Sequence, residues 1–438
     1  MALTGLDIYK LLPKTNCGDC GSPTCLAFAM KLASKQALLD SCPHVSEEAK
    51  AALGSASQPP IRLVKIGTGD SEIELGNETV LFRHEETFYH QTAVAIRVRE
   101  KDPDIESRLE EIGKLRFVRV GEDIRVNLLA LAEESGKPEE YAGFVEHCRA
   151  RTRLGMILIS GSPACLKAAL EKEKEQKPLL WAATADNLEE YAVLARTYSC
   201  PLVVRGNGLG ETADLAARAR EKGVEDLVLD SSPPGLREAL ADQVSIRRQA
   251  LKKQFRPLGY PTIAFTDPAA DPFTQTMEAA VLIAKYAAII VTDLTRPEYI
   301  LPLLTARQNI YTNPQKPIQV EPKIYPVGSP DRSSPLIVTT NFSLTYFTVE
   351  GEVEASRVPA YLLIVDTEGT SVLTAWAADK FNAETIARAL NDSGIAERLD
   401  HKNLILPATW RSSPGNWKMN RAGRSWSAPR KPRGYRSS

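Results

Sequence analysis

The sequence predicts a multidomain α/β protein with a small N-terminal domain, a central (β/α)8 barrel and a small C-terminal α/β domain. Three observations lead to this fold class. Four of the seven cysteines fall within the 26 residues from Cys17 to Cys42. Short apolar runs alternate with amphipathic segments over residues 61–328. A further apolar run, a polar turn and a helix-like segment follow after residue 329. The 438 residues are enough for two to four domains, each with its own core.

The N-terminal module, residues 1–57, is defined by its cysteines. A Cys-x2-Cys pair, a third cysteine after four residues and a fourth after sixteen can converge on one metal centre if the intervening turns are tight. Glycine permits such turns because it adopts backbone conformations that other residues resist. The four candidate ligands are Cys17, Cys20, Cys25 and Cys42.

Three explanations compete for this cysteine cluster. Structural zinc sites usually combine two Cys-x2-Cys or Cys/His pairs, and the Cys-x4-Cys step breaks that pattern. Disulfides need an oxidising compartment, but the first residues lack a basic segment followed by an apolar core, so we expect a cytoplasmic chain. An iron–sulfur cluster takes four thiolates, and a proline directly after the last cysteine, as in Cys42-Pro43, also occurs in ferredoxin-type runs. Spacing favours the cluster, while zinc and unligated thiols stay open.

The module has little core of its own, so we expect its fold to depend on the metal. Apolar spacing predicts two helices, over residues 4–12 and 25–39, on either side of the loop that carries the first cysteines. A small, polar and proline-rich segment, residues 54–60, reads as the linker that ends the module.

Residues 61–328 alternate between predicted strands and predicted helices. Parallel strands need a crossover, usually a helix, and about eight such units in this length match a closed (β/α)8 barrel; an open, doubly wound sheet is the alternative. The predicted strands are Thr92–Val98, Ile124–Leu131, Met156–Ser160, Leu179–Thr184, Leu202–Gly206, Leu227–Asp230, Thr262–Thr266 and Ala288–Asp293. The predicted helices are Pro163–Lys174, Leu188–Tyr198, Thr212–Lys222, Pro234–Lys253, Thr274–Tyr286 and Pro297–Gln308.

Several polar residues lie where barrel strands are expected to end, which is where barrel active sites are built. Asp230 and Asp293 are candidates to which the sequence assigns no chemistry. The glycine-rich segment at residues 205–210 follows a strand and precedes a helix, but it lacks the full Gly-x-Gly-x-x-Gly spacing, so a simple connection is favoured over a phosphate loop. His84, His90 and His147 form no metal-spaced pair and are interpreted as ordinary packing or surface residues; this interpretation rests on spacing alone.

Residues 329–406 form the predicted C-terminal domain. The buried run Tyr361–Asp366 leads into a Gly/Thr/Ser turn and then a helix from Val372 to Lys380. Such a turn presents backbone amides and hydroxyls at a helix N-terminus, which suits phosphate, carboxamide or another polar ligand edge. A simple capped turn with no ligand is an equally good explanation of this loop taken alone.

Charge and hydropathy exclude some function classes. The chain has 54 basic and 55 acidic residues, but residues 407–438 contain eight Lys or Arg and no acid. Residues 1–406 therefore carry a net charge of about −9, which argues against a general nucleic-acid surface. No apolar run approaches the roughly 20 residues of a membrane-spanning helix.

The cysteine module with Cys42-Pro43 resembles the iron–sulfur domain of the large (gamma) subunit of the corrinoid iron–sulfur protein of the reductive acetyl-CoA pathway. The resemblance continues through Leu81-Phe82-Arg83-His84-Glu85, through Thr339-Thr340-Asn341-Phe342-Ser343-Leu344-Thr345-Tyr346 and through residues 365–375. It covers Met1 to about Pro407. The cysteine motif is shared with other redox proteins, whereas its combination with the Thr-Thr-Asn-Phe-Ser-Leu-Thr stretch is specific.

This resemblance implies a [4Fe–4S] domain, a TIM-like barrel and a Rossmann-like corrinoid-binding domain. Members carry methyl groups: corrinoid cobalt accepts methyl from methyltetrahydrofolate through a methyltransferase and delivers it to acetyl-CoA synthase/CO dehydrogenase. Partners would be the small subunit, in a heterodimer, these two enzymes and a reductive activator, with no nucleic acid and no membrane. Cys17, Cys20, Cys25 and Cys42 would ligate the cluster. The corrinoid contacts would be Thr339, Thr345, Gly369, Thr370, Ser371 and Val372.

The residues support part of this mechanism independently. The Asp-x-His-x-x-Gly motif that often supplies a histidine to cobalt is absent, and His401 is the only histidine after residue 147. Cobalt without a strong axial nitrogen ligand should be easier to reduce to Co(I). Iron–sulfur potentials extend down to about −700 mV, so the cluster can plausibly return stray Co(II) to Co(I).

Two other functions stay open: an iron–sulfur electron-transfer protein without corrinoid, and a pterin-dependent barrel methyltransferase.

The last 32 residues, 407–438, depart from the family pattern. No Val, Ile or Leu occurs after Leu406, and three of the five tryptophans lie in this segment. Such a composition supplies no buried strand. Too little apolar surface would be buried to offset the conformational entropy lost on folding, so we expect an atypical, disordered tail. A reading-frame change is the preferred explanation, and a genuine basic tail that binds RNA or an acidic partner is the alternative. Either would leave the last strand of the corrinoid domain in doubt.

Overall fold

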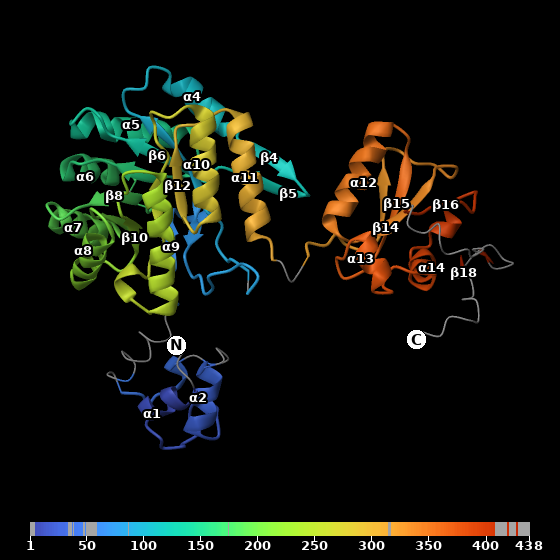
Figure 1. Cartoon of the computed structure of the whole chain (residues 1–438), viewed down its shortest axis with the longest axis horizontal. Coiled ribbons are helices and arrows are strands. Elements are labelled where there is room, and N and C mark those ends of the chain that lie inside the picture. Colours follow the sequence, from blue (N-terminus) through green and yellow to red (C-terminus); the bar gives the residue numbers. More distant parts are fainter. Residues whose placement is uncertain are drawn as a thin grey trace. The chain divides into compact units, whose positions relative to one another are not determined.

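The computed structural model groups the chain into two compact units, each described here by itself (Figure 1). The first comprises Met1–Arg116 and Arg125–Tyr311, and the second comprises Phe117–Ile124 and Thr312–Ser438. The structure describes residues 5–33, 37, 39–46, 49, 59–85, 87–173, 175–313 and 317–407, and the backbone of 418–419 and 426–427.

The described residues of the N-terminal module include α1 (Gly5–Leu11), α2 (Cys25–Ala33) and the 3-10 turn η1 (Leu39–Ser41). Both helices lie within the ranges that the apolar spacing predicts, and residues 34–36 and 38 of the second predicted range lie outside the described residues. Ile8 and Leu12 pack with Phe28 in a small core that also contains Cys25 and Cys42. The thiols are thus part of the core, which agrees with a module that has few other apolar residues to bury.

The barrel contains eight parallel strands in chain order. Each neighbouring pair forms a ladder except β10 and β11, which are joined by one bridge between Leu229 and Thr262 with a 2.9 Å hydrogen bond from Leu229 N to the Pro261 carbonyl, and the last strand pairs with the first. This arrangement confirms the barrel and excludes the open sheet. The strands are β3 (Ala93–Arg99), β6 (Leu128–Ala132), β7 (Gly155–Ile159), β8 (Leu179–Ala183), β9 (Leu202–Arg205), β10 (Leu227–Asp230), β11 (Ile263–Phe265) and β12 (Ile289–Thr292).

A helix follows every barrel strand and covers the outside of the sheet (Figure 1). Short strands buried on both faces need such crossovers, because a parallel partner can be reached only by returning along the sheet. The helices are α4 (Ile105–Gly113), α5 (Pro138–Arg151), α6 (Pro163–Lys172), α7 (Leu188–Tyr198), α8 (Leu209–Glu221), α9 (Leu236–Lys252, followed by η3, Arg256–Leu258), α10 (Pro272–Ala284) and α11 (Pro297–Tyr311).

A small antiparallel hairpin closes the N-terminal end of the barrel. It consists of β1 (Val64–Ile66) and β2 (Ile73–Leu75), joined by η2 (Gly69–Ser71). Val64, Ile66 and Leu75 are fully buried in the same cluster as Ala93 and Leu128, the first residues of β3 and β6. The hairpin therefore fills the end of the barrel opposite to the carboxyl ends of the strands.

Two parts of residues 61–328 differ from the predicted pattern. The run predicted as one strand, Ile124–Leu131, is divided, because its first residues close a second hairpin of β4 (Arg116–Arg119) and β5 (Glu122–Arg125). That hairpin turns at Val120 and Gly121, which both have positive φ as a two-residue type I′ turn requires. At the other end, β13 (Ile324–Val327) pairs antiparallel with β15 in the second sheet rather than with the barrel.

The second unit is built on a four-stranded sheet in the order β13-β15-β14-β16. The three strands β14 (Leu336–Thr340), β15 (Ala360–Val365) and β16 (Leu404–Ile405) are parallel, and β13 is an antiparallel edge. The helices are α12 (Ser343–Ser356), α13 (Val372–Ala377) and α14 (Ala383–Asp392), with the 3-10 turn η4 (Ile395–Glu397).

Side chains of this sheet alternate between two cores, as strand geometry requires. Leu336 and Val338 pack in one cluster with residues of α13 and α14, and Ile337 packs on the other face in a cluster with Tyr346 of α12. Most of the predicted tail lies outside the described residues. Its described parts are β17 (Lys418–Met419) and β18 (Trp426–Ser427), which pair antiparallel.

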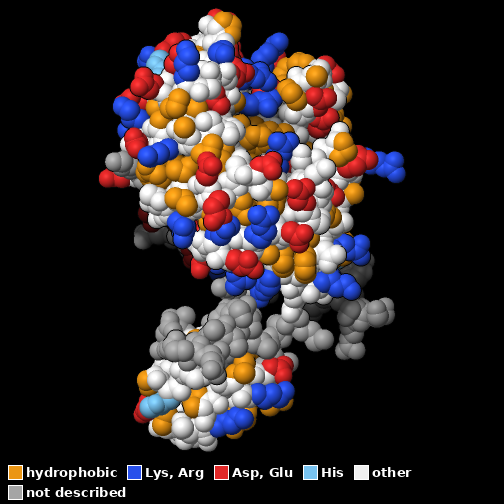
Figure 2. Space-filling view, turned by 90° about the vertical axis from the view of Figure 1, so that its left-hand side faces the viewer, with side chains coloured by type: hydrophobic (Ala, Val, Ile, Leu, Met, Phe, Trp, Pro, Cys, Tyr) orange, Lys and Arg blue, Asp and Glu red, His pale blue; other side chains and the backbone are white. Residues whose placement is uncertain are grey.

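The described surface carries charges of both signs. Figure 2 shows Lys and Arg side chains interspersed with Asp and Glu over the face in view, rather than gathered into a patch of one sign. Within the described residues, no helix is both long enough and apolar enough to cross a membrane.

The β9–α8 connection gives a test of barrel packing. A Cβ added to Gly206 would overlap the backbone nitrogen of Thr212 and lie 2.7 Å from its Oγ1, whereas a Cβ at Gly210 meets nothing within 4 Å. We expect Gly206→Ala to destabilise the barrel by about 1–3 kcal/mol through overpacking. Gly210→Ala, inside α8, should be stabilising by about 0.5–1 kcal/mol because alanine is the better helix former. Urea unfolding followed by circular dichroism measures both; equal effects would contradict the close packing at Gly206.

Candidate cofactor-binding sites

The four predicted cluster ligands lie on the loop and helix of the N-terminal module. Cys17 is exposed and Cys20 half-buried in the loop before α2, Cys25 is the first residue of α2, and Cys42 directly follows η1. Cys25 and Cys42 are buried, and Cys20 packs against the same core cluster. The loop turns because Gly18 and Gly21 adopt φ of +82° and +73°, which glycine alone tolerates well.

Asn16, which the sequence analysis did not single out, holds the loop onto α2. Its side-chain Oδ1 accepts a 2.8 Å hydrogen bond from the backbone nitrogen of Cys25, and its own backbone nitrogen donates to Cys25 Sγ at 3.4 Å. An N–H group directed at a cysteine sulfur is one of the features that set the potential of an iron–sulfur cluster. A lone asparagine before a cysteine gives no sequence signal for this contact.

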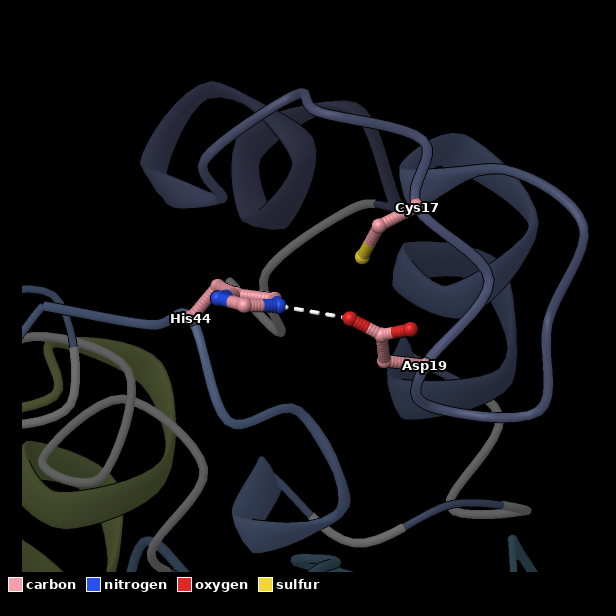
Figure 3. A group of neighbouring side chains, drawn as sticks. All are labelled: Cys17, Asp19 and His44. Atoms are coloured by element: carbon pink, nitrogen blue, oxygen red, sulfur yellow. Dashed lines mark hydrogen bonds and ion pairs between the residues drawn. The ribbon is translucent and has the colours of Figure 1, made fainter.

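Cys17, Asp19 and His44 form a group whose potential ligand atoms all lie within 4.8 Å of one another (Figure 3). His44 Nε2 and Asp19 Oδ2 are 2.6 Å apart, which links the first cysteine loop to the segment after Cys42. Hydrogen bonds with His44 and then Cys17 hold the pKa of Asp19 below its usual value. All three side chains are exposed.

The spacing of the sulfur atoms bears on which metal centre fits. Zinc–sulfur bonds of about 2.3 Å place the thiolates of a tetrahedral site about 4 Å apart. Among the described residues, which include all four cysteines, no three of these sulfurs come within 4.8 Å of one another. Within the described part of the chain, the four thiols therefore form no preassembled tetrahedral site.

The second candidate site lies at the carboxyl end of β14. Three hydroxyl groups there are buried without a hydrogen-bond partner: Oγ1 of Thr339, Oγ1 of Thr340 and Oγ of Ser343. Their residues are 2%, 0% and 2% exposed. A buried, unpaired hydroxyl costs about 1–3 kcal/mol, so each of these groups is a candidate for a bound partner. Because consecutive strand residues face opposite sides of a sheet, Thr339 and Thr340 offer their hydroxyls on different faces of β14. Of these, the sequence analysis predicted only Thr339.

Asn341, between these hydroxyls, is by contrast fully bonded. Its Oδ1 accepts hydrogen bonds from the backbone nitrogens of Thr367 and Gly369 and from the Thr367 hydroxyl. Its Nδ2 donates to Asp366 and Gln319. The side chain thereby ties the end of β14 to the loop that follows β15.

The loop after β15 contains most of the predicted corrinoid contacts. Gly369 has φ +70°, and the Thr370 hydroxyl donates to the Thr367 carbonyl at 2.7 Å. Ser371 is the N-cap of α13, and Val372, the first residue of that helix, packs against the sheet core. Thr345 is half-buried in the first turn of α12. The structure thus places all six predicted residues on three neighbouring segments: β14, the first turn of α12, and the loop that leads into α13.

The strand order explains why a ligand would bind here. From β14 the chain moves to β15 on one side and later to β16 on the other, and open α/β sheets bind ligands at the carboxyl ends of the strands where the order reverses in this way. Exposed apolar side chains occur in the helices that begin at this edge: Leu344 in α12, and Leu373 and Trp376 in α13. Apolar surface beside a few unpaired polar groups is typical of small-molecule sites.

The barrel mouth carries polar groups that are already paired. Asp230 is 4% exposed and accepts hydrogen bonds from the Trp181 indole at 3.1 Å and the Ser232 backbone nitrogen at 2.8 Å. Arg205 stacks on the Trp181 ring, with its guanidinium carbon 5.0 Å from the ring centroid. Burial raises the pKa of Asp230 against the opposing effects of these neighbours.

Asp293 follows β12, two strands along the barrel from Asp230, and is held by arginines. Arg97 donates two hydrogen bonds of 2.7 Å to the two carboxylate oxygens, and Arg99 adds one of 3.0 Å. Burial alone would raise the pKa of Asp293, but the bonds and charge of Arg97, with the charges of Arg99 and Arg108, hold it below its usual value. Both strand-end aspartates therefore have structural partners.

The glycine-rich loop at residues 205–210 also has its amides committed. The backbone nitrogen of Gly206 donates to the Asp230 carbonyl, that of Gly208 to the Ser231 carbonyl, and that of Asn207 to the Glu211 carboxylate. The Glu211 carboxylate thus binds the backbone amide of Asn207, which a bound phosphate would otherwise use. These bonds favour the simple connection over the phosphate loop.

Replacing a single hydroxyl should affect the stability of the chain differently according to whether that hydroxyl is hydrogen-bonded. We expect Thr340→Val to leave the ligand-free chain as stable or about 1 kcal/mol more stable, because valine has the same shape and removes an unsatisfied group. Thr367→Val should lower stability by about 1 kcal/mol, since that hydroxyl contacts Asn341 and the Thr370 carbonyl. Denaturant unfolding gives both values, and equal losses would contradict the unpaired state of Thr340.

The Asp293 ion pair predicts a pH dependence. A carboxyl with a lowered folded-state pKa contributes stability above its unfolded pKa of about 3.9, and this contribution is lost as pH falls through the folded value. Asp293→Asn should therefore be less stable than the wild type at pH 7, by about 1–3 kcal/mol, and the difference should shrink below pH 4. Asp186→Asn, at an exposed site, is the control. A difference that does not change with pH would show that charge is not involved.

Two family models match the chain. The CdhD family model, described as CO dehydrogenase/acetyl-CoA synthase delta subunit, matches residues 63–434, and a model that describes an Fe-S cluster matches residues 12–44. The first match extends over most of the basic tail, which the sequence analysis had placed outside the family pattern.

Relatives align over nearly the whole chain. The corrinoid/iron-sulfur protein large subunit of Moorella thermoacetica is 47% identical, over 93% of this chain and 92% of that protein. The acetyl-CoA decarbonylase/synthase complex subunit gamma of Methanothermobacter thermautotrophicus is 37% identical over the same shares. Among solved structures, a dihydropteroate synthase from Thermus thermophilus aligns with a TM-score of 0.38 and 16% identity, over 57% of this chain and 100% of that one. By the full-length matches, the chain belongs to the family of corrinoid iron–sulfur protein large subunits and acetyl-CoA decarbonylase/synthase gamma subunits.

Proposed function

We propose that the chain is a corrinoid-dependent methyl carrier, of methyltransferase type, that acts together with a small subunit. The three unpaired hydroxyls at the carboxyl end of β14 carry this proposal, because a buried polar site with no partner in the protein needs a bound one. The family membership supplies the identity of the ligand, a corrinoid, and of the pathway, which forms acetyl-CoA.

Each cofactor has residues that suit it. Cys17, Cys20, Cys25 and Cys42 would hold a [4Fe–4S] cluster. Thr339, Thr345 and the loop from Gly369 to Val372 would hold the corrinoid, and we add Thr340 and Ser343 to this set because their hydroxyls are unpaired. When bound, the corrinoid would carry methyl from a methyltetrahydrofolate methyltransferase to acetyl-CoA synthase/CO dehydrogenase, and the cluster would restore cobalt to the methyl-accepting Co(I) state.

The position of His401 supports a corrinoid without an axial histidine from this chain. His401 is the only histidine of the second unit, and its Nε2 is 2.8 Å from the Ser334 carbonyl, just before β14 begins. The unpaired hydroxyls lie at the other end of the same strand. His401 is therefore placed away from the proposed corrinoid face, as expected for cobalt that must be reduced easily.

Metal analysis of the anaerobically purified complex with the small subunit tests this function. We expect about four iron atoms per complex, as a [4Fe–4S] cluster requires, and about one cobalt, with a visible spectrum that changes on reduction. Cys42→Ala should lose iron and keep cobalt, while Thr340→Val should keep iron and retain less cobalt. Cys148→Ala, a buried barrel thiol whose pKa burial raises to about 12, is the control and should keep both metals.

Two results would favour the other functions. Iron without cobalt in the wild-type complex would indicate an electron-transfer protein. Binding of methyltetrahydrofolate by this chain alone would indicate a pterin-dependent barrel methyltransferase.

A further inference from the structure

Asn341 is 1% exposed and uses the full hydrogen-bonding capacity of its side chain. The carboxamide oxygen receives three hydrogen bonds, from Thr367 N at 3.0 Å, Thr367 Oγ1 at 3.0 Å and Gly369 N at 2.9 Å. The amide nitrogen donates to Asp366 Oδ1 at 3.0 Å and to Gln319 Oε1 at 3.2 Å. None of these groups is free to contact a ligand while the bonds are made.

These bonds join three segments that are distant in sequence. Asn341 directly follows β14, Thr367 and Gly369 lie in the loop after β15, and Gln319 belongs to the segment that leads into the second unit. That segment is also paired through its backbone: Ser343 N donates to the Ile318 carbonyl and Val320 N to the Asn341 carbonyl, each at 3.0 Å. One side chain therefore connects the entering segment to the loop.

The loop has few other hydrogen bonds. Those between Thr367 and Thr370 and from Glu368 N to Asp366 are local, and the exposed Glu368 side chain pairs with Lys380, beyond α13. Gly369 lies so close to Gln319 that an added Cβ would be 2.5 Å from Gln319 Cγ. Local bonds shape the turn, but only those of Asn341 attach it to the sheet.

We propose that Asn341 is a positioning residue: it holds the loop from Thr367 to Gly369 in one conformation, and this conformation determines how long the corrinoid stays bound. The inference rests on the proposed function. A loop that is already ordered loses less conformational entropy when the ligand binds. Loss of the Asn341 hydrogen bonds should therefore appear as faster dissociation of the corrinoid. Asn341 itself does not touch the ligand.

The chain offers a rescue experiment. Asn341→Asp keeps the acceptor oxygen but replaces the donor by a second carboxylate oxygen that faces Asp366. Adding Asp366→Asn restores one donor and one acceptor between positions 341 and 366 with their places exchanged, although Asp366 Oδ1 also accepts from Glu368 N and that bond is lost. Asn403→Asp, an exposed asparagine of the same unit, controls for the added charge.

Two measurements are made on these variants. The first is amide hydrogen exchange at Thr367 and Gly369 in the corrinoid-free complex. The second is the dissociation rate of cobamide from the loaded complex, followed by its visible spectrum. We expect Asn341→Asp to speed both by about 10- to 100-fold, as loss of a buried hydrogen bond would. The double variant should return both toward the wild-type values, and Asn403→Asp should change neither.

The outcomes separate this proposal from the function on which it rests. Faster exchange with unchanged cobamide dissociation would overturn the positioning role, and so would exchange that Asn341→Asp leaves unchanged. If Asp366→Asn slowed neither rate at all in the Asn341→Asp background, the donor–acceptor bond between positions 341 and 366 would be contradicted. A wild-type complex that retains no cobamide would overturn the proposed function, whatever the exchange rates show.

Discussion

Parallel strand pairing is the constraint on which the rest of this structure depends. Each parallel strand must be followed by a crossover, so the strands of a sheet all end at one edge and the connecting loops gather there. Both units obey this rule, and in both the polar strand-end residues meet at that edge. In the barrel these residues satisfy one another, as Asp230 does with Trp181 and Asp293 with Arg97. In the small sheet Thr339, Thr340 and Ser343 do not, and the difference locates the proposed cofactor site.

The sequence predicted what depends on local periodicity. Barrel strands buried on both faces read as short apolar runs, and their helices as amphipathic segments, so the (β/α)8 barrel followed from their number and spacing. The β4–β5 hairpin was missed because its residues are mostly polar or half-buried and its turn, Val120-Gly121, begins with a β-branched residue that rarely takes positive φ. β13 was assigned to the barrel range because nothing local distinguishes an antiparallel edge strand from a short barrel strand.

The candidate sites were predicted unevenly for a similar reason. Cysteine has few common roles in such spacing, so the four thiols stood out. Asn16, Asn341 and Ser343 did not, because asparagine and serine are frequent at turns and helix ends, and only the fold shows which of them are bonded and to what. The unpaired state of Thr340 depends on the burial of its neighbours, which is a property of the packed unit. The resemblance to a known family predicted contacts in the same stretch, and the burial and bonding of each residue came from the structure.

The second unit is assembled from two separate parts of the chain, residues 117–124 and 312–438. About 190 residues lie between Ile124 and Thr312. At translation rates of about 5–20 residues per second, the hairpin leaves the ribosome about 10–40 s before the first residue of its eventual partner segment is made. During that time the barrel can fold around the hairpin's two ends, but the hairpin itself has no unit to join. A fragment that begins at Thr312 would accordingly lack one piece of its own fold, and gene truncations at that boundary would yield an incomplete unit.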